Sequence, residues 1–166
     1  MEGALDANPA DKQLHFEYAT LLLDTGNSDR EKFLYHLLRS FTKGDKNIHA
    51  QFLFARHAYE SADEGGNRGH EVFRYLRETP TMQYEHRVEL KDVIRENEEP
   101  VSFTGVMERK EDTYGFIRVD GRGNRIFAHK DDVKKDSWEK LTTGSRCSFN
   151  IGFTFLGPKA IAVESE

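Results

Sequence analysis

Residues 113–129 carry the pattern that most constrains the fold of this chain, because two alternating runs flank a glycine-rich turn. The segment reads TYGFIRVDGRGNRIFAH. Successive side chains of a β-strand point to opposite faces, so the alternation predicts a two-stranded hairpin. One face holds small or aliphatic side chains suited to a barrel interior: Gly115, Ile117, Val119, Ile126 and Ala128. The other face holds the aromatic and polar side chains: Tyr114, Phe116, Arg118, Phe127 and His129.

The outer face of this predicted hairpin would bring three aromatic rings and a histidine together in solvent. Such a cluster indicates a contact surface, since large apolar patches are usually covered. Basic residues surround it: Arg109, Lys110, Arg118, Arg122, Arg125 and Lys130. Rings among cations are typical of a platform on which the bases of single-stranded nucleic acid stack. The predicted nucleic-acid-binding residues are Tyr114, Phe116, Arg118, Arg125, Phe127, His129, Lys130 and Arg109.

The residues YGFI at 114–117 and IFAH at 126–129 resemble the two ribonucleoprotein-type motifs of the cold-shock domain. Further matches to the spacing of that family are Gly105-Val106, Leu141, Gly144, Cys147, Phe149, Gly157-Pro158, Ala160 and Val163. The resemblance covers residues 102–166 and implies a five-stranded OB-type β-barrel. It also implies binding of single-stranded RNA or DNA, without strong sequence preference, on the outer face of the hairpin.

The chain departs from the cold-shock pattern in the first barrel strand, which is expected at residues 102–108. The family continues this strand with a Trp-Phe pair, whereas this chain has Glu108 and Arg109. Stacking of a base on an aromatic ring contributes ~1–3 kcal/mol, so the two missing rings should weaken binding. Glu108, Glu111 and Asp112 add negative charge, and the arginines compensate in part by stacking and by pairing with phosphate. We expect binding that is weaker or more selective than that of a free-standing cold-shock protein.

Helical periodicity dominates the first hundred residues. After the leading residues 1–9, one pair of helices is predicted over 11–42 and a second pair follows it. The pattern Phe16-x-Tyr18-Ala19 recurs 36 residues later as Phe52-x-Phe54-Ala55. This period resembles the tetratricopeptide repeat (TPR), whose helical hairpins stack into a solenoid. The alternative is a small unclassified helical bundle.

Two features of this helical region depart from a regular repeat. Residues 62–69 are expected to form a long turn between the helices of the second pair, because they contain three glycines. Residues 80–97 are expected to form a charged capping helix with these apolar side chains: Met82, Tyr84, Val88, Leu90, Val93 and Ile94. We therefore predict an α+β chain of two domains, TPR-like helical repeats over 1–99 and a cold-shock-like barrel over 100–166. A chain that opens within a repeat array is expected to be part of a larger protein.

Charge is spread unevenly along the chain. The net charge of −5 would by itself argue against nucleic-acid binding. Residues 101–166, however, hold 11 Lys and Arg against 10 Asp and Glu, and the preceding residues hold 13 against 19. The basic side chains therefore gather around the aromatic strands, although the surplus there is small.

Other residues that could carry chemistry favour structural roles. Cys147 is the single cysteine, alternates with apolar residues and is expected to be a core thiol; a chain without disulfides suits a reducing cytoplasm. The seven histidines show no spacing typical of a metal site, and no catalytic triad, carboxylate pair or nucleotide fingerprint is present. No run approaches the ~18 apolar residues of a membrane span. We expect no catalytic residues, no metal and no cofactor.

Two functions of different classes remain open from the sequence. In the first, the barrel binds single-stranded RNA or DNA, and the helical repeats bind a protein partner or a further segment of a longer chain. In the second, the whole chain is a protein-interaction scaffold and the aromatic face of the barrel docks protein. The ring cluster and its arginines favour the first function, whereas the near-neutral charge of the barrel and the missing Trp-Phe pair favour the second.

Overall fold

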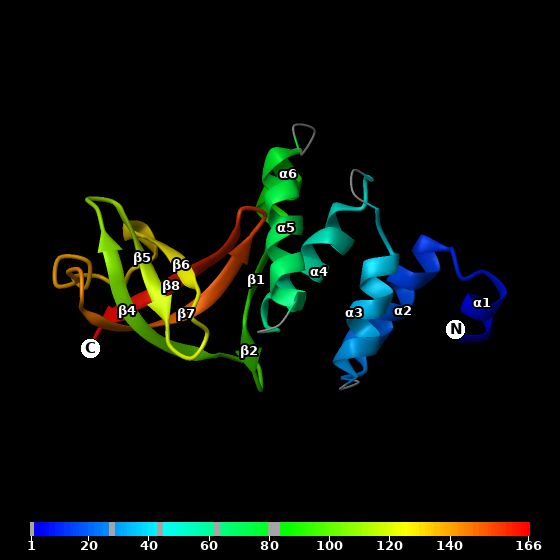
Figure 1. Ribbon diagram of the computed structural model, residues 1–166, viewed down its shortest axis with the longest axis horizontal. Coiled ribbons are helices and arrows are strands. Elements are labelled where there is room, and N and C mark those ends of the chain that lie inside the picture. The colour runs from blue at the N-terminus through cyan, green and yellow to red at the C-terminus, as the bar shows by residue number, and fades with distance from the viewer. Residues whose placement is uncertain (1, 27–28, 43–44, 62–63, 80–83) are drawn as a thin grey trace. The chain divides into compact units, whose positions relative to one another are not determined.

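The computed structural model describes residues 2–26, 29–42, 45–61, 64–79 and 84–166. These residues fall into two compact units, residues 1–87 and residues 88–166. Figure 1 shows the first unit as a set of helices and the second as a strongly curled sheet. The α+β organisation predicted from the sequence is confirmed.

Polar side chains cap the starts of helices α2, α3 and α4. Their bounds are α1 Glu2–Ala7, α2 Lys12–Asp24, α3 Arg30–Arg39, α4 Ile48–Tyr59, α5 Glu64–Glu78 and α6 Tyr84–Glu89. The carboxylate of Asp11 accepts a hydrogen bond from the backbone N–H of Leu14 at 3.0 Å at the start of α2. Asp29 and Asn47 cap α3 and α4 in the same way. Each cap satisfies one of the backbone donors that a helix start leaves unpaired.

The core of the helical unit forms where α2 packs on α3, α3 on α4 and α4 on α5. Ala19, Ala55 and Ala58 are fully buried, so small side chains lie in the core where the helices pack. Larger buried residues fill the layers between them: Leu22, Phe33, Leu37, Phe54, Phe73 and Leu76. The two predicted helical hairpins are therefore present, and their likeness to the tetratricopeptide repeat stays a prediction.

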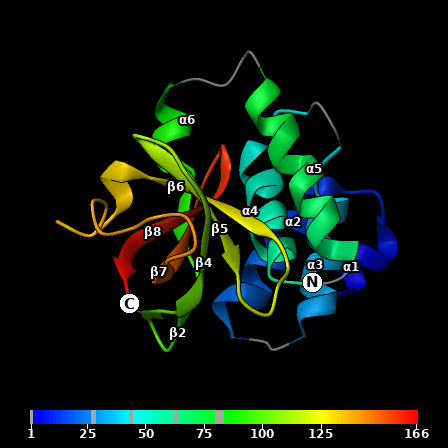
Figure 2. The ribbon, with the colours of Figure 1, turned by 60° about the vertical axis from the view of Figure 1, so that its left-hand side comes forward.

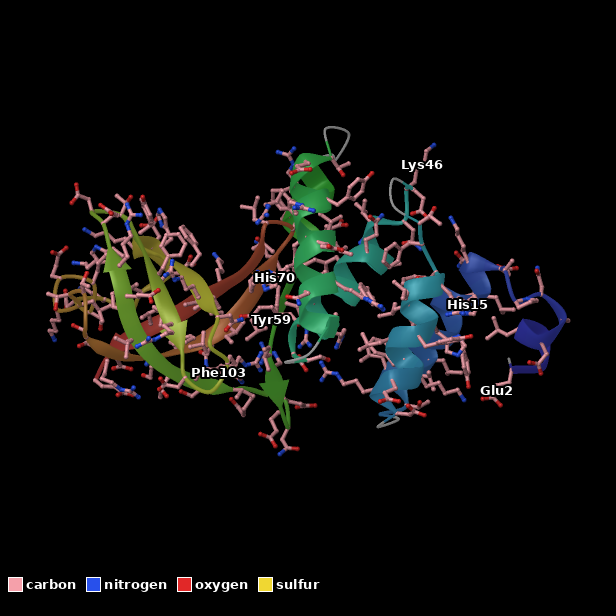
Figure 3. All side chains as sticks on the ribbon, viewed as in Figure 1. Glu2, His15, Lys46, Tyr59, His70 and Phe103 are labelled. Atoms are coloured by element: carbon pink, nitrogen blue, oxygen red, sulfur yellow. The ribbon has the colours of Figure 1, made fainter. Side chains whose placement is uncertain are left out.

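The leading residues contribute a short helix to this unit. Leu5 of α1 is buried in the same core cluster as Tyr18. The carboxylate of Glu2 accepts a hydrogen bond from the Tyr18 hydroxyl at 2.6 Å and pairs with Lys32 (Figure 3). The apolar contact and the ion pair together hold α1 against α2 and α3.

The glycine-rich stretch of the second helical pair is not a long turn. Ala62 and Asp63 lie outside the described residues, and the remainder of the expected turn belongs to α5, which begins at Glu64. A Cβ atom at Gly69 would lie 2.8 Å from the carbonyl oxygen of Ala55 and 3.3 Å from the backbone nitrogen of Tyr59. This glycine therefore permits close packing of α5 on α4. It lies within a helix and not in the turn that the glycine spacing predicts. Figure 3 labels Tyr59 and His70, whose rings are 5.5 Å apart across this contact.

The predicted capping helix over 80–97 is also wrong beyond residue 89. Helix α6 ends at Glu89, and β1, Lys91–Val93, runs antiparallel to the end of β7, with Val93 paired to Gly152. Strands β2, Arg95–Glu96, and β3, Glu99–Pro100, then form a small hairpin. Met82 lies outside the described residues. Residues 91–93 pair with β7, and the backbone N–H of Ile94 donates to the carbonyl oxygen of Ile151 at 3.0 Å, so this stretch belongs to the sheet and not to a helix. The compact unit that contains the barrel comprises residues 88–166.

Five strands of the second unit close into a barrel (Figure 2). Their bounds are β4 Ser102–Lys110, β5 Tyr114–Val119, β6 Arg125–His129, β7 Arg146–Thr154 and β8 Gly157–Ser165. The strand order is β7-β4-β5-β6-β8, and β8 pairs again with β7, so the sheet meets itself. All these pairs are antiparallel except β6 with β8. The five-stranded barrel implied by the sequence resemblance is confirmed.

The barrel interior is apolar and contains the cysteine. Met107, Ile117 and Ile151 are among its fully buried side chains, and Trp138 and Leu141 of the β6–β7 connection are buried as well. The Cys147 thiol is buried beside the carbonyl oxygen of Gly105, with Sγ 3.7 Å from it. Burial raises the pKa of this thiol to about 11, which keeps it in the unreactive protonated form at neutral pH. None of the described helices is both long enough and apolar enough to cross a membrane.

Two histidines of the helical unit are held in their neutral form. His36 is buried, and its Nδ1 lies 2.8 Å from Nδ1 of His15, so burial and this neighbour lower its pKa. Burial also lowers the pKa of His57 to about 3, with the nearby charges of Arg56 and Arg30 adding to the effect. A guanidinium N–H of Arg56 points at Nδ1 of His57 at 3.1 Å, where a proton would otherwise bind.

We expect the helical unit to lose stability as the pH falls below about 6.5. The unfolded chain protonates these histidines near that pH, whereas the folded chain protonates them only at lower pH, so the unfolded state binds more protons. For His57 alone the loss should reach about 2 kcal/mol by about pH 5. Urea unfolding followed by far-UV circular dichroism measures this loss of stability, when it is carried out above about pH 6.5 and again at about pH 5. The variant His57→Gln, which keeps an acceptor for Arg56 and does not titrate, should lose less stability; an equal loss would contradict the assignment to His57.

Candidate nucleic-acid interface

Strands β5 and β6 place the predicted ring residues side by side on the outside of the barrel. The register pairs Tyr114 with His129, Phe116 with Phe127 and Arg118 with Arg125. Between these pairs lie Gly115 with Ala128 and Ile117 with Ile126, all of them buried. The predicted alternation is confirmed, because the barrel interior takes every second residue and leaves the others outside.

The three aromatic rings and the imidazole support one another. Tyr114 and Phe127 are nearly parallel, with ring centroids 6.1 Å apart and an interplanar angle of 22°. Phe116 meets both rings edge to face, at 6.0 Å from Tyr114 and 5.9 Å from Phe127. Phe127 is the most exposed of the three, with 37% of its surface accessible. The centroid of the His129 ring lies 6.4 Å from that of Phe127. Rings fixed in this way lose little side-chain freedom when a ligand covers them.

His129 has a structural contact as well as its place on this face. Its Nδ1 accepts a hydrogen bond from the backbone N–H of Asp131 at 3.2 Å and so caps the short 3-10 helix Lys130–Asp132. In the neutral ring the proton then lies on Nε2. The imidazole is held in one orientation by Nδ1, and Nε2 remains as a donor for a polar atom of a ligand.

A β-bulge in β4 determines what stands beside the rings. Met107 pairs with Ile117, but the next pair joins Arg109 to Phe116, so Glu108 is the extra residue. Phe116 faces outward, and its partner Arg109 therefore does so too. The carboxylate of Glu108 pairs with Nε of Arg125, which also lies on the outer face. The bulge thus puts two consecutive charged residues outside, where the cold-shock pattern has two rings.

The predicted basic residues are distributed around the ring cluster in different ways. Arg118 and Arg125 are exposed beside it, and Arg109 lies across from Phe116 and pairs with Glu111 at 2.7 Å. Lys130 follows His129 and pairs with Glu139 at 3.1 Å. Arg122, by contrast, lies over the ring of Phe103 at 5.3 Å, away from the ring cluster. The structure therefore brings together all eight predicted binding residues, and of the surrounding cations it sets Arg122 apart.

Sequence reasoning missed two features of this surface. Val106 pairs with Arg118 and adds an apolar side chain to the outer face. A hollow of about 430 Å³ lies beyond the Tyr114–His129 end of the strands and is lined by Lys110, Glu111, Asp112, Lys130, Trp138 and Glu139. Lys110 there stands over the Trp138 ring at 5.1 Å. The alternation of β4 up to the bulge points to Val106, whereas nothing in the local pattern brings Trp138 next to Lys110.

No group of three or more His, Cys, Asp or Glu side chains within the described part of the chain could hold a metal ion. The polar groups near the rings are arginines, lysines and their carboxylate partners. The chemistry available on this face is stacking, ion pairing and hydrogen bonding.

Close packing behind the rings depends on Gly115. A Cβ atom at this position would lie 2.7 Å from the carbonyl oxygen of Arg109 and 2.8 Å from Sδ of Met107. Both contacts are shorter than real Cβ atoms show, and one of them is with backbone. Gly115 therefore lets β4 and the Met107 side chain approach β5 between Tyr114 and Phe116.

The variant Gly115→Ala should destabilise the barrel by ~1–3 kcal/mol, because the added methyl group overpacks this contact. Trp138 is the single tryptophan of the chain and is buried in the barrel unit, so its fluorescence during urea unfolding reports on the barrel. Gly3→Ala serves as the control, since a Cβ atom there meets nothing within 4 Å. An unchanged Trp138 transition in Gly115→Ala would contradict the close approach.

A family model matches the barrel of this chain. Residues 103–165 match the model of the family described as 'Cold-shock' DNA-binding domain. Among solved structures, one described as drosophila Unr CSD456 is similar, with 21% sequence identity and a TM-score of 0.36. The similarity covers 40% of this chain and 27% of that chain. No curated protein matches this sequence. The family match and the closed five-stranded barrel identify residues 103–165 as a cold-shock domain.

Proposed function

We propose that the cold-shock domain of this chain binds single-stranded RNA or DNA on the outer face of β5 and β6. Bases stack on Tyr114, Phe116, Phe127 and His129, and the phosphates pair with Arg118, Arg125, Lys130 and Arg109. The observation that carries this proposal is the cluster of three mutually packed, partly exposed rings among arginines. The name of the matched family, a DNA-binding domain, is consistent with it.

The rings are better explained by a ligand than by the stability of the barrel. The interior is already filled by the residues between them, such as Ile117 and Ile126, which are 0% and 1% exposed. An aromatic side chain left partly in water forgoes part of its burial energy. Stacking a base on such a ring recovers ~1–3 kcal/mol, whatever the base, because every base has a π-face.

The cations around the rings are few, and most of them already have acidic partners. Arg125 pairs with Glu108, Arg109 with Glu111 and Lys130 with Glu139. A phosphate must compete with these carboxylates, which lowers the electrostatic part of the affinity. With three or four phosphate contacts, the logarithm of the binding constant should fall as the logarithm of the salt concentration rises, with a slope of about −2 to −3. We therefore propose binding of moderate affinity in which stacking contributes more than charge.

We propose that the helical unit binds a protein partner or a further segment of a longer chain. Support comes from a groove of about 490 Å³ lined by Phe41, Gln51, Glu71, Val72, Arg74, Tyr75 and Glu78. Its apolar side chains lie among charged ones, as in surfaces that take an amphipathic peptide. The reduced, buried Cys147 suits a chain that works in the cytoplasm.

The second candidate function for the outer face is docking of a protein. The observation that favours it is the set of three ion pairs around the rings, which leaves the face nearly neutral. Salt separates the two candidates, because only phosphate contacts release condensed counterions from a nucleic acid.

The double variant Phe116→Ala, Phe127→Ala should bind a labelled oligouridine strand at least ~10-fold more weakly than the parent chain, because two stacking positions are lost. Fluorescence anisotropy at low and moderate salt measures the affinity, and Trp138 fluorescence shows that the barrel is folded. Tyr35→Ala is the matched control, since this ring is 49% exposed on α3 of the helical unit. Absence of salt-sensitive binding in the parent chain would exclude the nucleic-acid function and favour a protein ligand.

A further inference from the structure

The Glu108–Arg125 pair spans the outer face of the barrel at one end of the ring cluster. Glu108 belongs to β4 and Arg125 to β6, and β5 lies between these two strands. The pair therefore crosses over β5 at the level of Phe116 and Arg118, the residues that neighbour Glu108 and Arg125 in the register. Arg125 and Phe127 are next neighbours on the same face of β6, about 7 Å apart along the strand.

Both members of the pair keep polar atoms for a ligand. The shortest contact of the pair joins Nε of Arg125 to Oε2 of Glu108. A carboxylate oxygen accepts more than one hydrogen bond and a guanidinium carries five N–H donors, so one ion pair does not use up the capacity of either group. The Arg125 side chain is 69% exposed and that of Glu108 33% exposed. An acceptor and several donors thus stand side by side next to the rings.

The bulge in β4 determines which face of the sheet the side chains of Glu108 and Arg109 occupy. Without the extra residue in β4, the position of Glu108 would pair with Phe116 directly, and Arg109 would turn toward the barrel interior. A β-bulge changes the aim of a side chain and is common next to binding sites. Here it places the Glu108 carboxylate on the outer face, against Nε of Arg125.

We propose that Glu108 and Arg125 together recognise the Watson–Crick edge of guanine in a strand bound to the ring cluster. Guanine presents two adjacent donors, N1–H and the N2 amino group, beside the acceptor O6. A carboxylate accepts from both donors, and a guanidinium donates to O6. Uracil presents one donor between two acceptors, so an oxygen of the carboxylate would face a carbonyl oxygen. The pair therefore favours guanine over uracil at the base position next to Phe116 and Phe127.

This inference rests on the proposed binding of single strands, and it adds selectivity at one base position. The other ring contacts are tolerant of sequence, since stacking depends little on the identity of the base. One well-placed pair of hydrogen bonds to a base edge typically changes affinity roughly tenfold. Glu108 is then the residue that turns a sequence-tolerant platform into one that prefers guanine, at the expense of affinity for strands that lack it.

The test compares an oligouridine strand with the same strand carrying one central guanosine. The parent chain should bind the guanosine strand roughly tenfold more tightly. Glu108→Gln should bind oligouridine more tightly than the parent does, because a negative charge is gone, and should lose the preference for guanosine. Inosine lacks the N2 amino group, so a strand with inosine in place of guanosine should lose most of the preference in the parent chain.

Glu111→Gln is the matched control, because it removes the same charge from the Arg109 pair nearby. It should strengthen binding to both strands alike and keep the preference for guanosine. Equal binding of both strands by the parent chain would overturn the recognition of guanine and leave the proposed single-strand function intact. Identical behaviour of the two glutamate variants would also overturn it, because charge alone would then explain the change. Failure of the parent chain to bind either strand would overturn both proposals.

Discussion

Closure of the barrel is the constraint on which the outer face depends. When β8 pairs with both β6 and β7, every strand must send alternate side chains into a small interior. That interior accepts aliphatic side chains such as Ile117 and Ile126, together with the small Gly115 and Ala128. The residues between them have no place inside, so three rings and a histidine line the outside at positions set by the register of β5 and β6.

Residues of opposite charge shape this face as much as the rings do. The bulge in β4 turns both Glu108 and Arg109 outward, and each finds an oppositely charged partner there. Ion pairs at an exposed surface contribute little to stability, typically ~0–1 kcal/mol, so their main consequence is for binding. They reduce the positive field that attracts phosphate and provide polar atoms that can distinguish one base from another. In the proposed binding of single strands, the charged pair that replaces two rings in the first strand changes the kind of recognition as well as its strength.

Patterns with a period of two were read correctly because their cause is local. The face of each residue in β5 and β6 follows from its parity, and the buried or exposed state of the candidate residues agrees with that reading. In the helical region, two predictions from the sequence differ from the structure. The glycine spacing predicts a turn at Gly69, whereas this glycine allows the close approach of α5 to α4. The apolar spacing predicts a helix through Leu90 and Ile94, whereas the residues between them pair with β7. In both places the deciding partner is distant in sequence.

By itself, the sequence determined the two-part organisation, the barrel, its lining and the ring face, because hydrophobic periodicity and glycine spacing act within a few residues. Only the tertiary structure decided where the barrel unit begins and that Glu108 meets Arg125. The first depends on hydrogen bonds between β1 and the end of β7, and the second on a bulge that shifts the register of β4 against β5. Both are pairings between separate strands, and pairing partners are chosen by the geometry of the whole sheet and not by the residues on either side.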